Sequence, residues 1–130
     1  MTVVLLRHAW AGDRDSWEGD DRLRPLDARG RRQAEALREA LLVHGVRRAV
    51  SSPYVRCTET VAPLALDIVL DDRLAEGADA DGARELLLSL SDAVACTHGD
   101  VIENVLGRKL KKGAAVVLDD LRVVAEIPAP

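Results

Sequence analysis

The chain has 130 residues, of which 48% are hydrophobic and 31% charged, so it can bury one core and is excluded from the disordered class. Its formal net charge of -4 lacks the basic excess typical of nucleic-acid-binding proteins. No apolar run reaches the length of a signal peptide or membrane span, which predicts a cytoplasmic protein without membrane or nucleic-acid partners.

The first half of the chain begins with a continuous β-branched and aliphatic run over residues 2–6, which predicts a buried strand. Residues 9–26 lack periodicity and predict a long loop. Asp27 is the expected N-cap of a helix over 28–44, followed by a strand over 47–51.

The next helix is expected to start at Ser52 and Pro53, with Ser52 as its cap, and to reach about residue 66. Pro63 should kink or shorten it. Residues 67–70 predict a short strand.

The remaining elements include a helix capped by Asp81 and ending near residue 90, and a strand over 92–97. A helix over 99–106 precedes a β-hairpin formed by 114–118 and 121–127. Strands that alternate with helices predict an α/β fold: a three-layer α/β/α sandwich with a mainly parallel central sheet and a C-terminal antiparallel edge hairpin. We expect a single domain over 1–130.

Unusual side chains follow several of the predicted strands. Arg7 and His8 end the first strand, Arg56 lies just after the second, Glu76 follows the third and His98 ends the fourth. Because ligand sites of open α/β sheets lie at the carboxyl ends of the strands, we expect these residues to converge.

This set suits phosphoryl chemistry. The planar guanidinium groups of Arg7 and Arg56, with protonated His98 as a third donor, can hold the oxygens of a phosphoryl group. A neutral His8 is then available as the nucleophile that attacks phosphorus. Glu76 is the candidate general acid for the leaving group and base for water.

The same residues belong to an ordered set of motifs that resembles the histidine phosphatase superfamily, the group that includes phosphoglycerate mutases. The motifs are Leu6-Arg7-His8-Ala9, Arg24-Pro25-Leu26 with Gly30 and Gln33-Ala34, Ser51-Ser52-Pro53 with Arg56 and Thr60, Arg73-Leu74-Ala75-Glu76, and Thr97-His98-Gly99-Asp100. The resemblance implies His8 as the phosphorylated nucleophile, Arg7, Arg56 and His98 as phosphate ligands, and Glu76 as proton donor. It implies no metal or other cofactor.

Within the superfamily, the small size resembles the short SixA-like phosphohistidine phosphatases, which lack a cap insertion. The stretch from Trp10 to Arg24 resembles the phosphatase domain attached to some MutT-type Nudix hydrolases, which act on nucleotides. The expected substrate is therefore a phosphomonoester, a nucleotide or a protein phosphohistidine, and Glu76 slightly favours an ester or anhydride. The alternative is a non-catalytic phosphate-binding or signalling module on the same fold.

Other residues are open to two interpretations. Cys57 and Cys96 are expected to be buried thiols, and a zinc site formed by Cys96, His98 and His8 would be one ligand short. Trp10 and Trp17 more simply pack the 9–26 loop, although either could stack on a planar substrate group. Arg14 and Trp10 are the candidates for the substrate rim, whereas Arg24 is expected to pair with a neighbouring aspartate.

Overall fold

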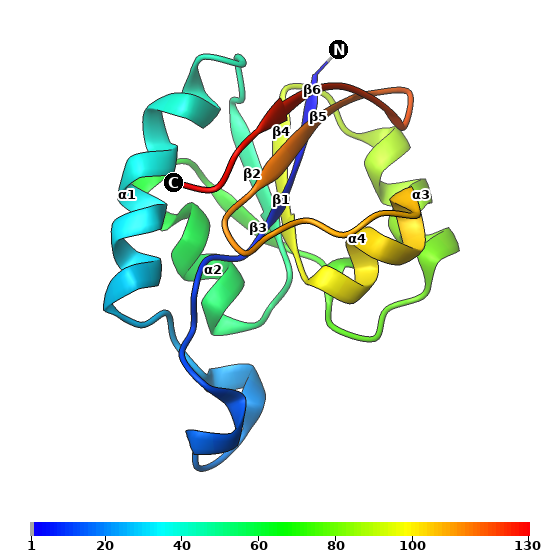
Figure 1. Cartoon of the computed structure of the whole chain (residues 1–130). Helices are drawn as coiled ribbons and strands as arrows, with labels where there is room; N and C mark the ends of the chain where they lie inside the picture. Colours follow the sequence, from blue (N-terminus) through cyan, green and yellow to red (C-terminus); the bar gives the residue numbers. More distant parts are fainter. Residues whose placement is uncertain (1) are drawn as a thin grey trace.

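The computed structural model describes residues 2–130 and has a mixed α/β fold built on one six-stranded sheet (Figure 1). The strand order is β3-β2-β4-β1-β5-β6. The strands are β1 (Val3–Arg7), β2 (Arg48–Ser51), β3 (Ile68–Leu70), β4 (Ala93–Thr97), β5 (Ala115–Asp119) and β6 (Arg122–Ile127). The first four strands in spatial order run parallel, and β5 and β6 add the expected antiparallel edge hairpin.

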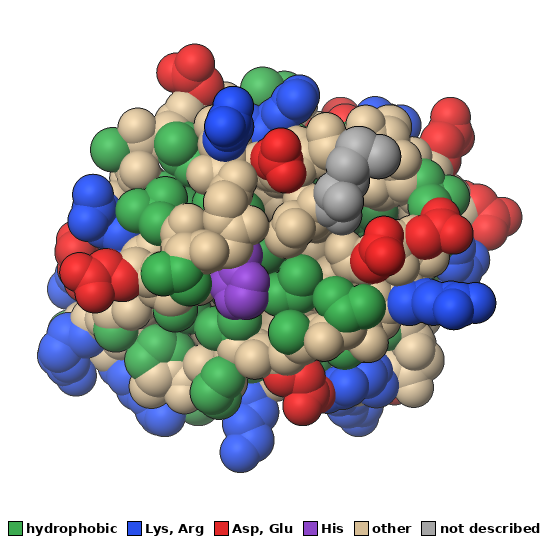
Figure 2. Space-filling model, turned by 90° about the horizontal axis from the view of Figure 1, so that it is seen from above, with side chains coloured by type: hydrophobic (Ala, Val, Ile, Leu, Met, Phe, Trp, Pro, Cys, Tyr) green, Lys and Arg blue, Asp and Glu red, His purple; other side chains and the backbone are tan. Residues whose placement is uncertain are grey.

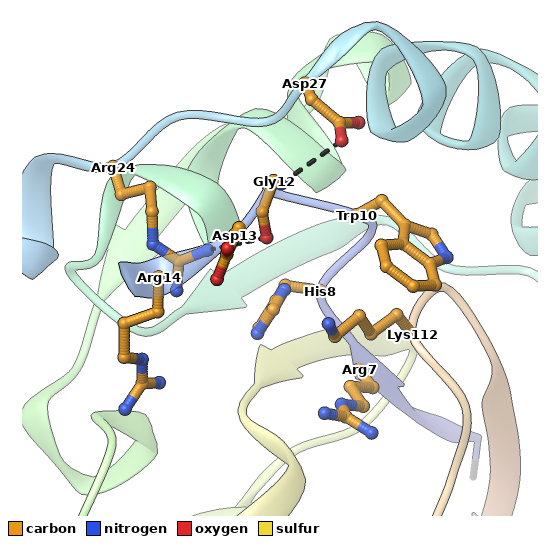
Figure 3. A pocket seen from close by; sticks show the side chains of 9 residues that line it. All are labelled: Arg7, His8, Trp10, Gly12, Asp13, Arg14, Arg24, Asp27 and Lys112. Carbon is orange, nitrogen blue, oxygen red and sulfur yellow. Dashed lines mark hydrogen bonds between the residues drawn. The ribbon is translucent and has the colours of Figure 1, made fainter. Parts of the chain in front are cut away.

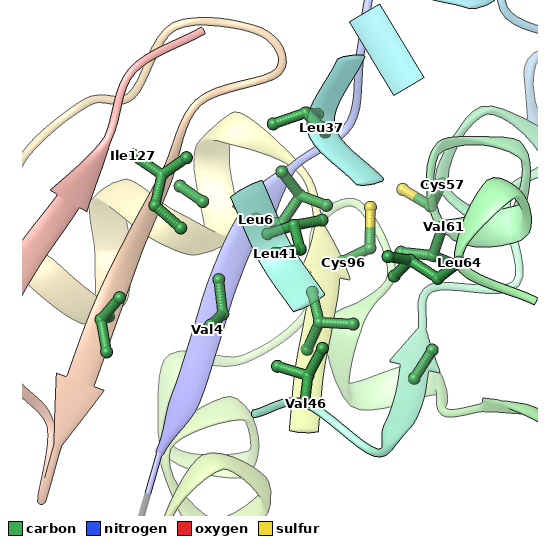
Figure 4. Close-up of a cluster of buried hydrophobic side chains, with 14 residues drawn as sticks. Val4, Leu6, Leu37, Leu41, Val46, Cys57, Val61, Leu64, Cys96 and Ile127 are labelled. Carbon is green, nitrogen blue, oxygen red and sulfur yellow. The ribbon is translucent and has the colours of Figure 1, made fainter. Parts of the chain in front are cut away.

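Four helices pack on the sheet: α1 (Ala28–Leu42), α2 (Val55–Val61), α3 (Ala80–Ser89) and α4 (Gly99–Leu106). Alternate residues of β1 point to opposite faces, as the pleat requires. Val4 and Leu6 share a buried cluster with α1 and α2 (Figure 4), whereas Val3 and Leu5 share another with α3 and α4. The two helix pairs therefore cover the two faces of the sheet.

Two predicted helix starts are wrong. Helix α2 begins at Val55, with Tyr54 as its N-cap, because the Ser52 hydroxyl accepts from the Tyr54 N–H and contacts His98 instead of capping a helix at Pro53. Helix α3 begins at Ala80, because Asp79 rather than Asp81 accepts the Gly82 N–H.

Other boundaries follow the sequence closely. Helix α1 is capped by Asp27, which accepts the Gly30 N–H, but ends at Leu42, two residues earlier than expected. Helix α2 gives way at Ala62 to a 3-10 turn that contains Pro63, which confirms the expected shortening. The long loop over 9–26 contains two 3-10 turns, Arg14–Ser16 and Asp21–Leu23.

The carboxyl ends of the parallel strands lie at the lower edge of the sheet in Figure 1, where the long loop also projects. Figure 2 shows the opposite end, where acidic and basic side chains are interspersed around the rim. Among residues 2–130, no helix combines the length and the apolar character needed to cross a membrane.

Candidate active site

The register of the parallel strands brings the two predicted histidines together. Strand β1 pairs with β4 so that Arg7 lies beside Thr97, and the His8 N–H donates to the Thr97 carbonyl at 3.1 Å. His8 and His98 each follow these paired positions, and their ring centroids lie 5.3 Å apart. The expected convergence of β1 and β4 at one sheet edge is thus a direct result of register.

His8 is poised as a neutral base. Its side chain is buried, and Nδ1 lies 2.8 Å from the carbonyl oxygen of Ala9, which can only accept a hydrogen bond. Nδ1 therefore carries the proton and Nε2 keeps its lone pair. Burial, together with the nearby positive charge of Arg56 and Arg7, lowers the pKa of His8 to about 3 despite the Ala9 hydrogen bond.

Arg7 is positioned by contacts with two distant segments. Its Nη1 donates to the Leu110 carbonyl at 2.7 Å. A Cβ atom at position 99 would lie 2.8 Å from the Arg7 Cζ, so the guanidinium occupies space that only Gly99 leaves. Gly99 is the first residue of α4, which directs the N-terminus of that helix at the same region.

Arg56 is fully buried on the first turn of α2. Its Nη2 lies 2.7 Å from Glu76 Oε2 and 3.1 Å from Asp21 Oδ2, and Nη1 donates to the Asp21 carbonyl. Two carboxylates and a carbonyl therefore balance a cation that would be costly to bury alone.

His98 is the N-cap residue of α4 and is buried against Tyr54. Its Nε2 lies 2.8 Å from the Ser52 hydroxyl and 3.6 Å from the Cys57 sulfur. These contacts hold the ring with its other nitrogen, Nδ1, turned away from Ser52.

Three buried side-chain nitrogens within residues 2–130 have no hydrogen-bond partner: Arg7 Nε, Arg56 Nε and His98 Nδ1. A buried donor without a partner costs free energy until it meets an acceptor. All three belong to the residues expected from the sequence to hold a phosphate. Two guanidinium groups and an imidazole in this arrangement could donate hydrogen bonds to an anion.

Glu76 and Arg14 meet beside this site. Arg14 Nη2 lies 2.8 Å from Glu76 Oε1, while the other Glu76 oxygen contacts Arg56. Both oxygens of Glu76 are thus engaged, and Arg14, a predicted rim residue, holds the carboxylate from the solvent side.

Two cavities share Arg7, His8 and Arg14 in their walls. One, of about 530 Å³, extends toward Trp10 and Lys112 (Figure 3). The other, of about 350 Å³, includes Glu76 and His98. His8 therefore faces enough space for a substrate larger than a phosphoryl group.

A model of the histidine phosphatase superfamily (branch 1) matches residues 3–85. The chain belongs to this superfamily. A curated relative, the 8-oxo-(d)GTP phosphatase of Mycolicibacterium smegmatis, is 40% identical over 116 residues. The match covers 81% of this chain but only 36% of the relative, so the chain spans little more than a third of that protein's length.

Solved structures share the fold of this chain. The protein histidine phosphatase SixA in complex with tungstate superposes with a TM-score of 0.84 at 16% identity, covering 98% of this chain and 97% of the other. TTHB049 from Thermus thermophilus gives a TM-score of 0.78 at 23% identity, covering 98% and 99%. At these low sequence identities, the comparison shows that the chain and the solved structures share a fold.

The two tryptophans of the chain have different surroundings. Arg29 Cζ and Lys112 Nζ each lie 4.2 Å from the centroid of the Trp10 ring, so cations already occupy its π-surface. Trp17 is 38% exposed, and its Nε1 donates to the Asp20 carbonyl within the loop. Trp10 lines the larger cavity and Trp17 does not.

Three residues of the site were not predicted to belong to it. Asp21 contacts Arg56, Ser52 contacts His98, and Lys112 lines the larger cavity. Asp21 also lies 2.9 Å from Arg24, which confirms the expected pairing of that arginine. Lys112 lies in a charge-rich stretch without a motif, whereas Asp21 falls within the Trp10 to Arg24 stretch and Ser52 within the quoted Ser-Ser-Pro motif.

The cysteines of the chain, Cys57 and Cys96, are buried free thiols. Within the described part of the chain, residues 2–130, no group of three or more His, Cys, Asp or Glu side chains could hold a metal ion. The three residues considered for a zinc site therefore do not form one there.

Proposed function

We propose that this protein is a phosphatase that uses His8 Nε2 as a nucleophile and passes through a phosphohistidine intermediate. The observation that carries the proposal is the set of unpaired nitrogens on Arg7, Arg56 and His98 beside a neutral imidazole. Three donors suit the three non-bridging oxygens of a phosphoryl group, and preorganised donors stabilise the charge of its transition state. The helices on both faces of the sheet support the three-layer α/β/α form of this fold.

The first step forms a bond between His8 Nε2 and phosphorus and breaks the bond between phosphorus and the leaving-group oxygen. The lone pair of Nε2 supplies the electrons of the new bond, and the leaving oxygen takes the pair of the broken bond. Glu76, when protonated, gives its proton to that oxygen.

In the second step a water oxygen attacks phosphorus, and the phosphorus–nitrogen bond breaks. Glu76 takes the proton of the water, so the enzyme returns to its starting state and releases inorganic phosphate. A substrate that draws Arg14 or Arg56 toward its own oxygens would free Glu76 from the ion pairs that engage both its oxygens. We assign Glu76 as general acid and base on this basis.

The proposed substrate is a phosphomonoester, a nucleotide or a protein phosphohistidine. The name of the Mycolicibacterium relative supports a nucleotide, and the open cavity beside Trp10 supports a leaving group of substantial size. We propose that residues 1–130 form one such domain without a cap insertion and that small phosphorylated molecules or phosphohistidine proteins are its partners.

The proposal is tested by incubating the protein with an aryl phosphate, with and without a chelator, beside His8→Ala. We expect turnover that resists the chelator and is lost in the variant. A phosphoenzyme trapped during turnover should be labile in acid and stable in base, as a phosphoramidate is.

Two other results would contradict the proposal, each in a different way. A protein that binds phosphate but turns over neither aryl phosphates, nucleotides nor phosphohistidine would be a non-catalytic phosphate-binding module. Loss of activity on chelation would instead indicate a metal-dependent mechanism.

A further inference from the structure

Lys112 reaches the larger cavity from the turn before β5, more than 100 residues after His8 in the sequence. Figure 3 shows its side chain between His8 and Trp10, above Arg7. None of the catalytic steps described above uses this ammonium group. Its position nevertheless depends on the same main chain that carries the nucleophile.

The main chain around Lys112 is tied directly to the site. The N–H of the next residue, Gly113, lies 3.1 Å from the carbonyl oxygens of both Arg7 and His8. Gly113 has a φ of +84°, and a Cβ atom there would lie 2.9 Å from Gln33 Nε2. Only glycine combines this positive φ with the close approach of the main chain to Gln33. The two hydrogen bonds of Gly113 then hold the neighbouring Lys112 at a fixed position relative to His8.

Gln33 of α1 links Lys112 to Trp10. Its Nε2 donates to the Lys112 carbonyl at 3.2 Å, and its Oε1 accepts from the Trp10 N–H at 3.0 Å. The Trp10 ring then supports the Lys112 ammonium, whose Nζ lies 4.2 Å from the ring centroid. Both the main chain and the side chain of Lys112 are therefore preorganised.

The positive charge at this position is not neutralised. Within residues 2–130, Lys112 Nζ has no salt bridge or hydrogen bond, and Arg7 beside it has no salt bridge either. Asp27, the nearby carboxylate, accepts the N–H groups of Gly12 and Gly30. Burial and the charge of Arg7 lower the pKa of Lys112, as expected for a cation held near other cations.

The transferred phosphoryl group already has three donors of its own on Arg7, Arg56 and His98. Lys112 lines the cavity beside Trp10, whereas Glu76 and His98 line the other. Arg14 borders both cavities and contacts Glu76, so a leaving group that starts beside Glu76 can extend toward Lys112.

We propose that Lys112, held by Trp10 and Gln33, forms a second anion subsite that binds a further anionic group on the leaving-group side of the substrate. The matching substrate class is a phosphate ester or anhydride whose leaving group carries a second anion, such as the inner phosphate of a pyrophosphate chain whose terminal phosphoryl group is transferred to His8. The inference rests on the proposed phosphatase function, because it places the second anion relative to a phosphoryl group at His8.

Binding of non-hydrolysable probes tests the subsite without requiring turnover. Dissociation constants for methylphosphonate and methylenediphosphonate would be measured by titration calorimetry on the wild type, Lys112→Met and Lys111→Met. Methionine keeps an unbranched stem over Trp10 but removes the charge, and Lys111 is an exposed neighbouring lysine that serves as the matched control.

The wild type should prefer the diphosphonate, and Lys112→Met should reduce this preference about tenfold, the value of one charge-assisted hydrogen bond. Lys111→Met should keep the preference, and Lys112→Arg should restore most of it. Thermal unfolding of each variant would show whether it is folded.

An unchanged preference in folded Lys112→Met would overturn the inference, as would an equal loss of affinity for both probes. Neither result would bear on turnover of the aryl phosphate, which tests His8 and the proposed function separately. Conversely, the protein could bind the diphosphonate through Lys112 and never form phosphohistidine. That result would support the anion subsite and contradict the proposed phosphatase mechanism.

Discussion

Gly99 makes room for Arg7: a methyl group at position 99 would lie 2.8 Å from Arg7 Cζ and 3.0 Å from Nε and Nη2. The absence of a side chain at the first residue of α4 therefore allows the Arg7 guanidinium to occupy its observed position. Gly99→Ala should displace Arg7 and lower kcat/KM for an aryl phosphate at least about tenfold, the value of a charged hydrogen bond.

The fold should tolerate this change, because alanine is the better helix former. Thermal unfolding should therefore show little loss of stability alongside the loss of activity. Gly82→Ala in α3 is the matched control, since its Cβ would meet Arg73 at an ordinary distance of 3.5 Å. Equal activity of Gly99→Ala and the wild type would show that catalysis does not depend on the observed position of the Arg7 guanidinium.

Asp21 secures the buried Arg56, and Asp21→Asn should destabilise the protein by about 1–2 kcal/mol because a buried cation loses one of its two carboxylates. Urea unfolding would measure the change. Asp20→Asn removes the charge from an exposed pair with Arg22, which solvent screens, and should leave the stability nearly unchanged. Similar effects of both substitutions would contradict the assigned role of Asp21.

Ser52 acts on the reaction through His98. Ser52→Ala removes the partner of His98 Nε2, 2.8 Å away, and should lower kcat/KM about fivefold to tenfold because the ring loses its orientation. The NMR chemical shifts of the His98 ring should change in the same variant. Ser51→Ala removes a neighbouring buried hydroxyl that donates to the Ser52 carbonyl and should leave the chemical shifts of the His98 ring unchanged.

Burial of neutral His8 should make the protein sensitive to acid. Unfolded His8 takes up a proton near pH 6.5, whereas folded His8 does so only near pH 3. Between these values the unfolded state binds more protons, so stability falls as the pH drops, by up to about 1.4 kcal/mol per pH unit from this residue. His8→Asn should lose this contribution.

The measurement is urea unfolding of both proteins at intervals from pH 7 to pH 4. The difference between the two curves isolates His8, because His44 and His98 are present in both proteins. Parallel stability curves would mean that folded His8 takes up its proton at the same pH as unfolded His8, which would remove the argument that burial keeps the imidazole neutral.

Much of the fold could be predicted because it depends on local pattern. Apolar runs and helical periodicity placed every strand and helix, and the Asp120-Leu121 turn with positive φ at both residues completes the expected hairpin. Helix starts were less predictable. Asp79 and Asp81 have the same capping chemistry, and Ser52 has a hydroxyl that can serve either a helix or His98, so only the surrounding structure selects between them.

The residues of the candidate site likewise fall into those that the sequence predicted and those that only the structure revealed. The sequence by itself determined that Arg7, His8, Arg56, Glu76 and His98 follow strands, because strand ends are a local property and parallel strands must end at one edge. Only the tertiary structure decided which groups complete the site. Asp21 reaches Arg56, and Lys112 reaches Trp10, across 35 and 102 residues of chain, and such contacts depend on packing that no local pattern encodes.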